Sequence, residues 1–512
     1  MRQLKLLNYD EIKPRLYQEL IATTAVSKNT LCILPTGMGK TLVAIMVAAY
    51  RLENFPESKI LMLAPTRPLV NQHMKTFRNL MKLKEPEYVA LTGKIHPRDR
   101  EVFYSKGRLF FATPELVRND IDNRILDLTD YSLIIVDECH RSRKKYAYTS
   151  VIENYVKKSL NPLILGLTAS PGGIRDKINE VKENLHIEAV EIRTETDDDV
   201  KPYVQEINVE RVYVELPDVL KRIRLYLEEA YRKRLEWLIQ VKLIYSMKVP
   251  KRELLELQVE IGKMYEQKKD FMVAKALTTC AQAIKIEHAI GLLETQGITP
   301  LYKYFLDLEK NKKSMATRNV LNDPSIINAI KLTKELFVKG IEHPKLDKLI
   351  DLIKEELAKK TNSKIIVFAN YRSSVEKITK LLGANNIAAK EFIGQAMKSG
   401  KGLTQKEQIE ILNEFGYELF NVLVATAVGE EGLDIEEVDL VIFYEPVPSE
   451  IRSIQRRGRT GRTKSGRVVF IITKGTRDEG YYWSAYHKER RMKKILYDMK
   501  EKTKDNLFDW TK

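Results

Sequence analysis

This sequence has few cysteines, and it shows no long apolar run and no targeting segment. Its three cysteines, Cys32, Cys139 and Cys280, lie far apart in the 512 residues and form no CxxC spacing. This excludes a disulfide framework and a cysteine-based zinc site, and it suits a reducing compartment. No run of about 18 apolar residues occurs, so we expect no membrane-spanning helix. The N-terminus has no uninterrupted apolar segment, so we expect no signal peptide and a cytoplasmic location.

Charged residues, in contrast, are abundant, and the positive ones are in excess. The chain has 86 Lys and Arg residues and 70 Asp and Glu residues, which gives a formal net charge of +16. A surplus of this size favours a polyanionic partner, and nucleic acid is the most common one. A Lys-rich surface that only improves solubility would have the same composition, so charge alone does not decide between the two.

Residues 1–205 are expected to form an α/β domain. Short apolar runs alternate there with helical patterns, and each run ends in a turn or a polar cluster. The runs are TLCILP, KILMLAP, RLFFAT, SLIIVDE and LILGLTAS. Such runs are typical of buried parallel strands joined by crossover helices. A further segment, INVERVYVELP, is expected to be a strand that leads out of this domain.

The rest of the chain is expected to hold a helical domain and a second α/β domain. From about residue 218 glycine is rare and apolar residues recur every three or four positions, as in amphipathic helices. Residues 206–340 are therefore assigned to an all-α domain inserted between two α/β domains. After Pro344 the apolar runs return, so residues 341–477 are assigned to a second parallel-sheet domain. Residues 478–512 are assigned to a basic helix and a polar tail.

The strongest local motif is LCILPTGMGKTLVAIMVAA, in which a strand enters a Gly-containing loop and an apolar helix follows. Backbone N–H groups of such a loop and the helix N-terminus bind phosphate. Lys40 would neutralise the β- and γ-phosphates of ATP, and the Thr41 hydroxyl would ligate Mg²⁺. Leu34 departs from the general GxxxxGK[ST] pattern, which has glycine there. The loop residues assigned to nucleotide binding are Thr36, Gly37, Gly39, Lys40 and Thr41.

A second motif, SLIIVDECH, is an apolar strand that ends in two adjacent carboxylates. Asp137 would hold the metal, and Glu138 would accept a proton from the attacking water. Acids that only cap a helix would look the same in isolation, but a phosphate loop in the same domain favours an ATPase centre. Cys139 and His140 do not make a metal site by themselves. We expect His140 to link the two α/β domains.

These two motifs and several others, in a fixed order, resemble those of superfamily 2 helicases along most of the chain. In the first half the other matching segments are PRLYQ, APTRPLV, TPE and Thr168-Ala169-Ser170. In the second half they are VFANYR, ATAVGEEGLDI and QRRGRTGR. The resemblance implies two RecA-like domains that bind ATP and Mg²⁺ in the cleft between them and move on nucleic acid.

The resemblance also implies roles for individual residues around the nucleotide. Arg15 and Gln18 would read the adenine, and Asp434 would approach the ribose. Gln455 would face the γ-phosphate. Arginine fingers would reach across the cleft because guanidinium groups stay charged and offer several donors. These fingers are Arg459 and Arg462.

Two further sets of residues follow from the same resemblance. Hydrolysis would be coupled to movement through His140, Thr168 and Ser170. The backbone of the nucleic acid would be held by Thr66, Arg67, Thr113, Arg372 and Thr426.

Within the superfamily, the DECH spelling and the helical insert resemble the group that contains archaeal Hef, the Fanconi anaemia group M translocase, Dicer and RIG-I-like receptors. The length and composition are most similar to the helicase part of archaeal Hef. This resemblance implies remodelling of forked or branched DNA in repair and at stalled forks. It also implies a nuclease domain on a longer parent chain, although no ERKxxxD nuclease signature is present here.

Two other functions stay open at this point. One is a duplex-RNA-stimulated ATPase of the RIG-I or Dicer type, and the other is a branched-DNA binding module in which ATP only switches affinity. Substrate choice is expected to lie in the insert, whose first helix is rich in basic residues. A solvated helix face would have the same composition, because Glu residues are interleaved. The basic residues in question are Lys221, Arg222, Arg224, Arg232, Lys233 and Arg234.

Overall fold

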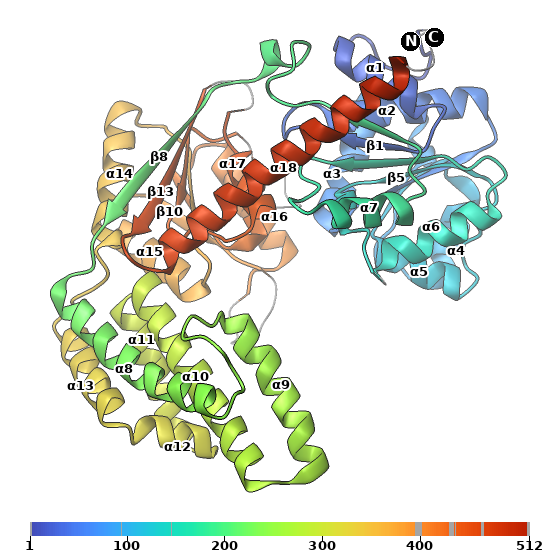
Figure 1. The fold of residues 1–512 in the computed structure, drawn as a ribbon. Helices are drawn as coiled ribbons and strands as arrows, with labels where there is room; N and C mark the ends of the chain where they lie inside the picture. Colours follow the sequence, from blue (N-terminus) through green and yellow to red (C-terminus); the bar gives the residue numbers. More distant parts are fainter. Residues whose placement is uncertain are drawn as a thin grey trace.

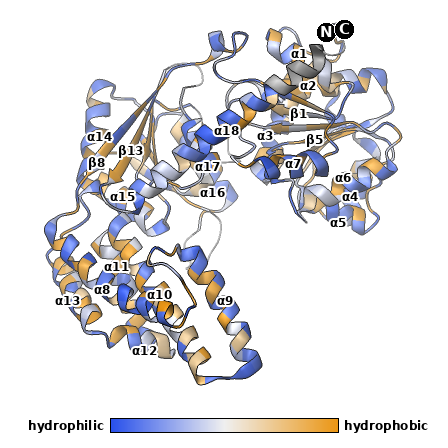
Figure 2. Cartoon of the chain, viewed as in Figure 1, coloured by the Kyte–Doolittle hydropathy of each residue, from blue (hydrophilic) through white to orange (hydrophobic). Residues whose placement is uncertain are grey.

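The fold follows the expected order of an α/β domain, a helical domain and a second α/β domain (Figure 1). A computed structural model describes residues 3–508 except for 94, 145, 395–401, 430–434, 436 and 462–464. Apolar residues are concentrated in the strands of both sheets, and hydrophilic residues alternate with apolar ones along the helices (Figure 2). Two parallel-sheet domains with a helical domain between them are therefore confirmed.

The first domain is a seven-stranded parallel sheet in the order β3-β4-β2-β5-β6-β1-β7. Its strands are β1 Thr30–Ile33, β2 Lys59–Leu63, β3 Tyr88–Ala90, β4 Leu109–Ala112, β5 Tyr131–Val136, β6 Ile164–Thr168 and β7 Ala189–Ile192. Its helices are α1 Leu16–Ala25, α2 Lys40–Asn54, α3 Arg67–Leu80, α4 Pro97–Lys106, α5 Pro114–Asp122, α6 Ala147–Lys158 and α7 Arg175–Asn184. Apolar layers cover both faces of the sheet. This is why the five predicted strands are continuous apolar runs.

The second domain is a six-stranded parallel sheet in the order β10-β11-β9-β12-β13-β8. Its strands are β8 Ile207–Val214, β9 Ile365–Phe368, β10 Ala389–Phe392, β11 Val422–Ala425, β12 Leu440–Phe443 and β13 Gly466–Thr473. Its helices are α14 Lys345–Lys359, α15 Arg372–Ala384, α16 Gln405–Gly416 and α17 Glu450–Arg457. β8 pairs with β13 along its whole length. The strand expected to lead out of the first domain, and assigned with residues 206–340 to the insert, is thus the edge strand of the second sheet.

The helical domain contains two apolar clusters within a bundle of helices. The helices are α8 Asp218–Gln240, α9 Lys251–Lys268, α10 Phe271–Thr295, α11 Ile298–Lys310, α12 Met315–Leu321 and α13 Pro324–Val338. Local sequence fixes two of the helix starts. Asp270 accepts hydrogen bonds from the first N–H groups of α10, and Asp323 does the same for α13, which also begins with proline.

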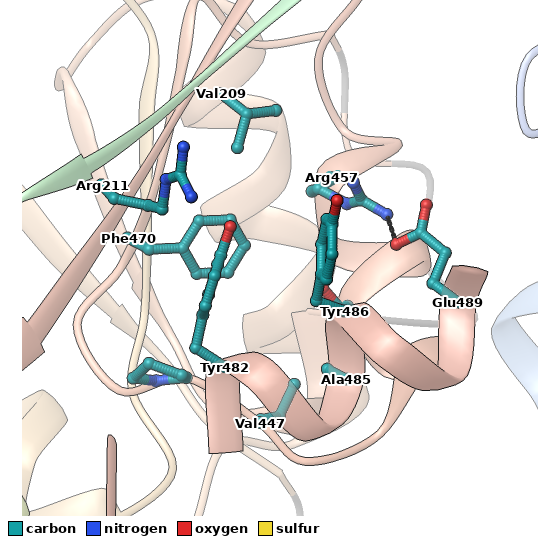
Figure 3. Close-up of a pocket in the computed structure, with 11 residues that line it drawn as sticks. Val209, Arg211, Val447, Arg457, Phe470, Tyr482, Ala485, Tyr486 and Glu489 are labelled. Carbon is teal, nitrogen blue, oxygen red and sulfur yellow. Dashed lines mark hydrogen bonds and ion pairs between the residues drawn. The ribbon is translucent and has the colours of Figure 1, made fainter. Parts of the chain in front are cut away.

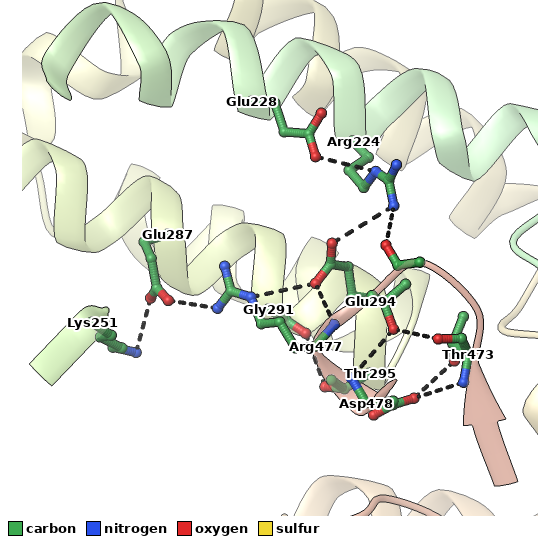
Figure 4. A network of polar contacts seen from close by, with 12 residues as sticks. Arg224, Glu228, Lys251, Glu287, Gly291, Glu294, Thr295, Thr473, Arg477 and Asp478 are labelled. Carbon is green, nitrogen blue, oxygen red and sulfur yellow. Dashed lines mark hydrogen bonds and ion pairs between the residues drawn. The ribbon is translucent and has the colours of Figure 1, made fainter. Parts of the chain in front are cut away.

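A polar network fastens the helical domain to the second α/β domain (Figure 4). Arg477 donates to Glu287 Oε1 at 2.6 Å and lies 3.3 Å from Glu294 Oε2, and both acids belong to α10. A side chain at Gly291 would lie 2.9 Å from the same guanidinium group, so glycine there lets Arg477 rest on α10. Arg224 of α8 donates to the loop after β13. The helical domain is therefore held to one of the two sheets.

The long helix α18, Arg477–Phe508, crosses from the second domain to the first (Figure 1). Near its start, Tyr482 packs edge-on against Phe470 of the second sheet with ring centres 5.0 Å apart. Further along, Met492 and Leu496 are buried in an apolar layer of the first domain. The segment expected to be a basic helix is thus a helix that joins the two α/β domains. In the part of the chain that the structure describes, no helix has the length and apolarity needed to cross a bilayer.

Candidate functional site

The phosphate loop lies between β1 and α2 and has the backbone conformation that its glycines allow. Gly37 and Gly39 have φ values of 81° and 77°, which a side chain would strain. A Cβ atom at Gly39 would also lie 2.4 Å from the amide nitrogen of Gln18. Lys40 Nζ donates to the carbonyl oxygens of Leu34 and Pro35, at 3.2 and 3.4 Å, and so lies over the loop. Loop N–H groups, a lysine and a helix N-terminus converge there, as phosphate binding requires.

The residues expected to read adenine tie helix α1 to this loop. Gln18 is buried, donates to Met38 O at 3.1 Å and accepts from Arg15 N at 2.8 Å. Tyr17 donates to the same Met38 oxygen at 2.9 Å. The Arg15 guanidinium lies 4.1 Å from the centre of the Tyr203 ring. Both ends of the Gln18 amide group thus bind backbone atoms, and adenine recognition by Arg15 and Gln18 stays a prediction.

The carboxylate expected to bind metal, Asp137, follows β5 directly and is only 7% exposed. Burial would raise the pKa of Asp137, but His73 and Lys40 outweigh burial and lower that pKa below its ordinary value. The carboxylate is therefore ionised next to the phosphate loop, where Thr41 follows Lys40. A hydroxyl oxygen and a carboxylate oxygen beside a phosphate cradle are the donors that Mg²⁺ prefers, so the residues present fit a Mg·ATP site.

The rest of the DECH segment connects to the Thr168–Ser170 segment. Glu138 has φ 48° and ψ 44°, a left-handed conformation that is strained for a residue with a side chain and that recurs at active sites. His140 Nδ1 lies 3.1 Å from Thr168 Oγ1 and 3.2 Å from Glu138 Oε2. Thr168 Oγ1 also accepts from Ser170 N at 3.1 Å. His140 was expected to link the two α/β domains, but these partners all lie in the first domain.

Within this segment, Ser170 contacts helix α18. Its hydroxyl donates to the sulfur of Met492, on α18, at 3.2 Å. The segment predicted to couple hydrolysis to movement therefore contacts the helix that joins the domains. The coupling roles of His140, Thr168 and Ser170 stay predictions.

Helix α17 brings the second domain to the phosphate loop. A side chain at Gly458, which directly follows this helix, would lie 2.8 Å from Thr36 Cγ2. Gln455 and Arg459 flank this point of contact, and each is 8% exposed. The end of α17 thus lies beside the phosphate loop, and the roles of Gln455 and Arg459 at the nucleotide stay predictions. Arg462 and Asp434 lie outside the described residues, and their roles stay predictions.

The residues expected to hold nucleic acid gather in two places. In the first domain a hollow of about 520 Å³ has Arg67 and Thr113 in its wall, together with Thr92 and Gly93. Thr66 and Thr113 precede α3 and α5, and neither side chain caps its helix. The Thr66 hydroxyl is buried and has no hydrogen-bond partner among the described residues. Two open helix N-termini and a cation at one hollow suit phosphate groups.

In the second domain the two expected residues follow neighbouring strands of the sheet. Arg372 begins α15, after β9, and donates to Gly394 O at 2.8 Å. Thr426 follows β11, and its N–H donates to Phe392 O at 3.1 Å. Carboxyl ends of parallel strands meet at one edge of a sheet, which is where ligands of α/β domains bind. The structure thus places Arg372 and Thr426 at one edge, and their contact with nucleic acid stays a prediction.

A cavity of about 250 Å³ lies between the second sheet, α17 and α18 (Figure 3). Tyr482 and Tyr486 of α18 line it, together with Arg211 of β8. Arg457 of α17 forms an ion pair with Glu489 of α18 at its rim. This cavity marks the packing of α18 against α17, the helix that approaches the phosphate loop.

Comparison with known proteins identifies the family of this fold. The sequence matches the DEAD/DEAH box helicase family over residues 15–177 and the helicase conserved C-terminal domain over residues 344–464. Residues 219–340 match a helical bundle described for ATP-dependent RNA helicases. The crystal structure of the Pyrococcus furiosus Hef helicase domain superposes with a TM-score of 0.74, at 46% identity, and the match covers 94% of this chain and 100% of that chain. The chain belongs to the Hef-type DEAD/DEAH-box helicases.

Relatives of this Hef-type helicase have names that refer to DNA in some cases and to RNA in others. A Methanocaldococcus jannaschii protein provisionally named an ATP-dependent RNA helicase is 44% identical, over 95% of this chain and 61% of that protein. The ATP-dependent DNA helicase MPH1 of Pyricularia oryzae is 34% identical, over 94% of this chain and 45% of its own length. The DEAD-box ATP-dependent RNA helicase FANCM of Arabidopsis thaliana is 35% identical, over 91% of this chain and 35% of its own length. The chain thus spans less than two thirds of each of these relatives.

Two residues of this Hef-type site were not predicted from the sequence. His73 lies on the buried stripe of α3, with Val70 and Phe77, and a histidine at that spacing has the pattern of an ordinary core residue. Met492 lies on the buried side of α18, more than 300 residues from its partner Ser170. Neither position shows a local motif, because each is brought to its partner only by the tertiary fold.

Proposed function

We propose that this chain is a nucleic-acid-dependent ATPase that remodels forked or branched DNA as a helicase or translocase. The observation that supports this most strongly is the contact of Gly458 with Thr36, which places the end of α17 against the phosphate loop. One nucleotide site is then built from both α/β domains. The Hef-type family and the names of the DNA helicases among the relatives support the substrate class.

Within the site, each side chain has a role that its position and charge allow. Lys40 would move from the loop carbonyls to the β- and γ-phosphates of ATP. Glu138 would accept a proton from the attacking water, and Arg459 would stabilise charge that develops on the γ-phosphate. Thr41 and Asp137 would hold Mg²⁺, which neutralises phosphate charge when bound.

Movement would follow from opening and closing of the two α/β domains. ATP would favour the closed arrangement because its phosphates contact both walls of the site, and hydrolysis would remove that bridge. Arg67 and Thr113 would hold the nucleic-acid backbone in the first domain, and Arg372 and Thr426 in the second. Contacts with the backbone are sensitive to salt and largely independent of base sequence.

The contacts of helix α8 weaken the expectation that its basic residues choose the substrate. The basic residues of α8 are mostly paired with acids or with backbone oxygens, which makes a solvated or structural role the simpler interpretation. These pairs are Lys221 with Asp218, Arg224 with Glu228, Arg232 with Glu236, Lys233 with Glu229, and Arg234 with Asp323. Arg222 is exposed, and it alone of the six has no partner among the described residues.

Location and wider assembly are part of the same proposal. Cys32, Cys139 and Cys280 are free and buried, which supports a cytoplasmic, reducing setting. A nuclease domain on a longer parent chain would act on the same branched DNA.

The test is ATP turnover by the wild type and by Lys40→Ala and Glu138→Gln, measured with single-stranded, linear duplex, forked and four-way DNA and with duplex RNA. We expect forked or four-way DNA to stimulate turnover at least about tenfold more than duplex RNA. Both variants should lose about 10³-fold or more of that turnover, because Lys40→Ala removes the amine that binds phosphate and Glu138→Gln removes the catalytic base. Stimulation mainly by duplex RNA would favour the RIG-I or Dicer type. Remodelling that survives Lys40→Ala would favour a binding module.

A further inference from the structure

His73 makes a contact that the ATPase scheme above does not use. Its Nε2 atom lies 2.8 Å from Asp137 Oδ2, and both side chains are buried. A carboxylate that holds a metal ion is ionised and can only accept a hydrogen bond. His73 is therefore the donor. The side chain expected to bind metal is held by a residue from a different segment of the chain.

The helix that provides His73 also begins at the hollow expected to hold nucleic acid. Helix α3 starts at Arg67, and the preceding Thr66 has a buried hydroxyl with no hydrogen-bond partner in the part of the chain that the structure describes. His73 lies six residues after Arg67, which corresponds to about 9 Å along a helix axis. Val70 and Phe77 pack the same side of α3 against the first sheet. A single helix thus connects the residues predicted to contact the nucleic-acid backbone, Thr66 and Arg67, to the predicted metal ligand Asp137.

We propose that His73 is a positioning residue that links nucleic-acid binding to the Mg·ATP site by orienting Asp137. This inference rests on the proposed function, because it requires a nucleic acid at the start of α3 and a nucleotide at Asp137. Hydrogen bonds to metal-binding carboxylates fix their orientation, and loss of such a bond typically costs about 10–100-fold in metal affinity or activity. A phosphate group bound at Thr66 and Arg67 would fix α3, and α3 would fix the Asp137 carboxylate through His73.

A link of this kind has to act in both directions. If nucleic acid tightens the binding of Mg·nucleotide by some factor, Mg·nucleotide must tighten the binding of nucleic acid by the same factor. We call the factor by which each ligand tightens the binding of the other the mutual factor. A residue that only fills space in the core would affect folding and leave the mutual factor unchanged. The mutual factor therefore separates a positioning role from a packing role.

The experiment measures two affinities by fluorescence, for a labelled DNA fork and for a non-hydrolysable ATP analogue with Mg²⁺, each with and without the other ligand. In the wild type we expect mutual tightening of about 5–150-fold. In His73→Ala we expect both factors to fall close to one. The Mg²⁺ concentration for half-maximal analogue binding should rise about 10–100-fold. His73→Gln, which keeps a donor, should recover part of the effect.

Two further variants make the result decisive. His73→Phe fills the same space without a donor, and it replaces the alanine variant if that one does not fold. Lys75→Ala changes an exposed residue of the same helix and should keep the wild-type factor. Wild-type mutual tightening that persists in His73→Ala or His73→Phe would overturn the role of His73 alone. No mutual effect in the wild type with any nucleic acid would instead count against the proposed function.

Discussion

At the scale of single residues, the second domain holds charged side chains where an apolar core would be expected. Arg456 is fully buried, its guanidinium lies 4.8 Å from the centre of the Phe368 ring, and it donates to Asn370 at 3.2 Å. Asn370 in turn donates its N–H to Glu445. A buried charge is costly unless it is paired, so such a network specifies one arrangement. It holds α17, which carries Gln455, against the loop that follows β9.

Glu445 gives this network a dependence on pH. Burial raises the pKa of Glu445 to about 7, although the Asn370 N–H and the nearby Lys345 oppose the rise. The folded protein therefore binds a proton at Glu445 over a range, from about pH 4.5 to 7, in which the unfolded chain has lost it. The stability that this proton provides is complete below about pH 4.5 and is lost as the pH rises through 7.

We predict that Glu445→Gln, which has the same shape and no charge to bury, becomes progressively more stable than the wild type as the pH rises. The difference in unfolding free energy should grow by about 3 kcal/mol between pH 4.5 and pH 8, because a pKa difference of about 2.5 corresponds to that energy. Urea unfolding of both proteins at several pH values measures it. A constant difference across this range would show that Glu445 is ionised throughout.

At the scale of helices and strands, the elements with a local pattern could be predicted from the sequence and the others could not. β1 and β5 are apolar runs bounded by turns, and the motifs that follow them are contiguous, so the phosphate loop and Asp137 could be placed at the ends of strands. β8 alternates between half-buried and exposed residues, as an edge strand does, but nothing local shows which sheet it joins. β3 and β7 are short and lack a long continuous apolar run, so they were not predicted from the sequence.

Helix α18 is the clearest case of contacts that the sequence pattern does not show. The sequence shows a basic helix, and its charge pattern gives no sign that Met492 would meet Ser170. Residues near its start are packed in the second domain, whereas Lys493 and Lys500 form ion pairs with Glu195 and Asp197 of the first. Motion between the domains must therefore change the contacts of α18 as well as the nucleotide cleft.

We predict that Met492→Leu weakens the coupling of hydrolysis to movement while it leaves the apolar packing nearly intact. Leucine keeps the volume, at a cost below about 1.5 kcal/mol, but it offers no sulfur acceptor to the Ser170 hydroxyl. DNA-stimulated ATP turnover should stay within about twofold of the wild type, and strand displacement per ATP should fall about two- to threefold, since the lost bond is weak.

A strand-displacement assay run in parallel with ATP turnover measures this ratio. Leu496→Ala is the control, because Leu496 lies one turn further in the same apolar layer and its hydrocarbon side chain cannot accept a hydrogen bond from Ser170. It should lower stability without changing the ratio. An unchanged ratio in Met492→Leu would remove α18 from the coupling path.

At the scale of the whole molecule, the structure divides into two bodies rather than three independent domains. Arg477 pairs with Glu287 and Glu294 of α10, whose side chains are almost completely buried, and Arg224 donates to the loop after β13. Buried pairs of this kind are costly to break, because one charge is left without its partner. The helical domain and the second α/β domain would therefore move together when the cleft closes, and α18 would limit the range of that motion.

If both bodies build one nucleotide site, Arg459 is the described residue whose removal tests this most directly. The measurement is ATP turnover and ATP affinity of Arg459→Ala in the presence of forked DNA, with Arg457→Ala as the matched control, since Arg457 pairs with Glu489 on α18. Arginine fingers contribute about 10³–10⁵-fold to turnover. We predict a loss of at least about 10³-fold in Arg459→Ala, with ATP affinity within a few-fold of the wild type and little change in the control. Turnover of Arg459→Ala within about tenfold of the wild type would contradict a nucleotide site that both bodies share.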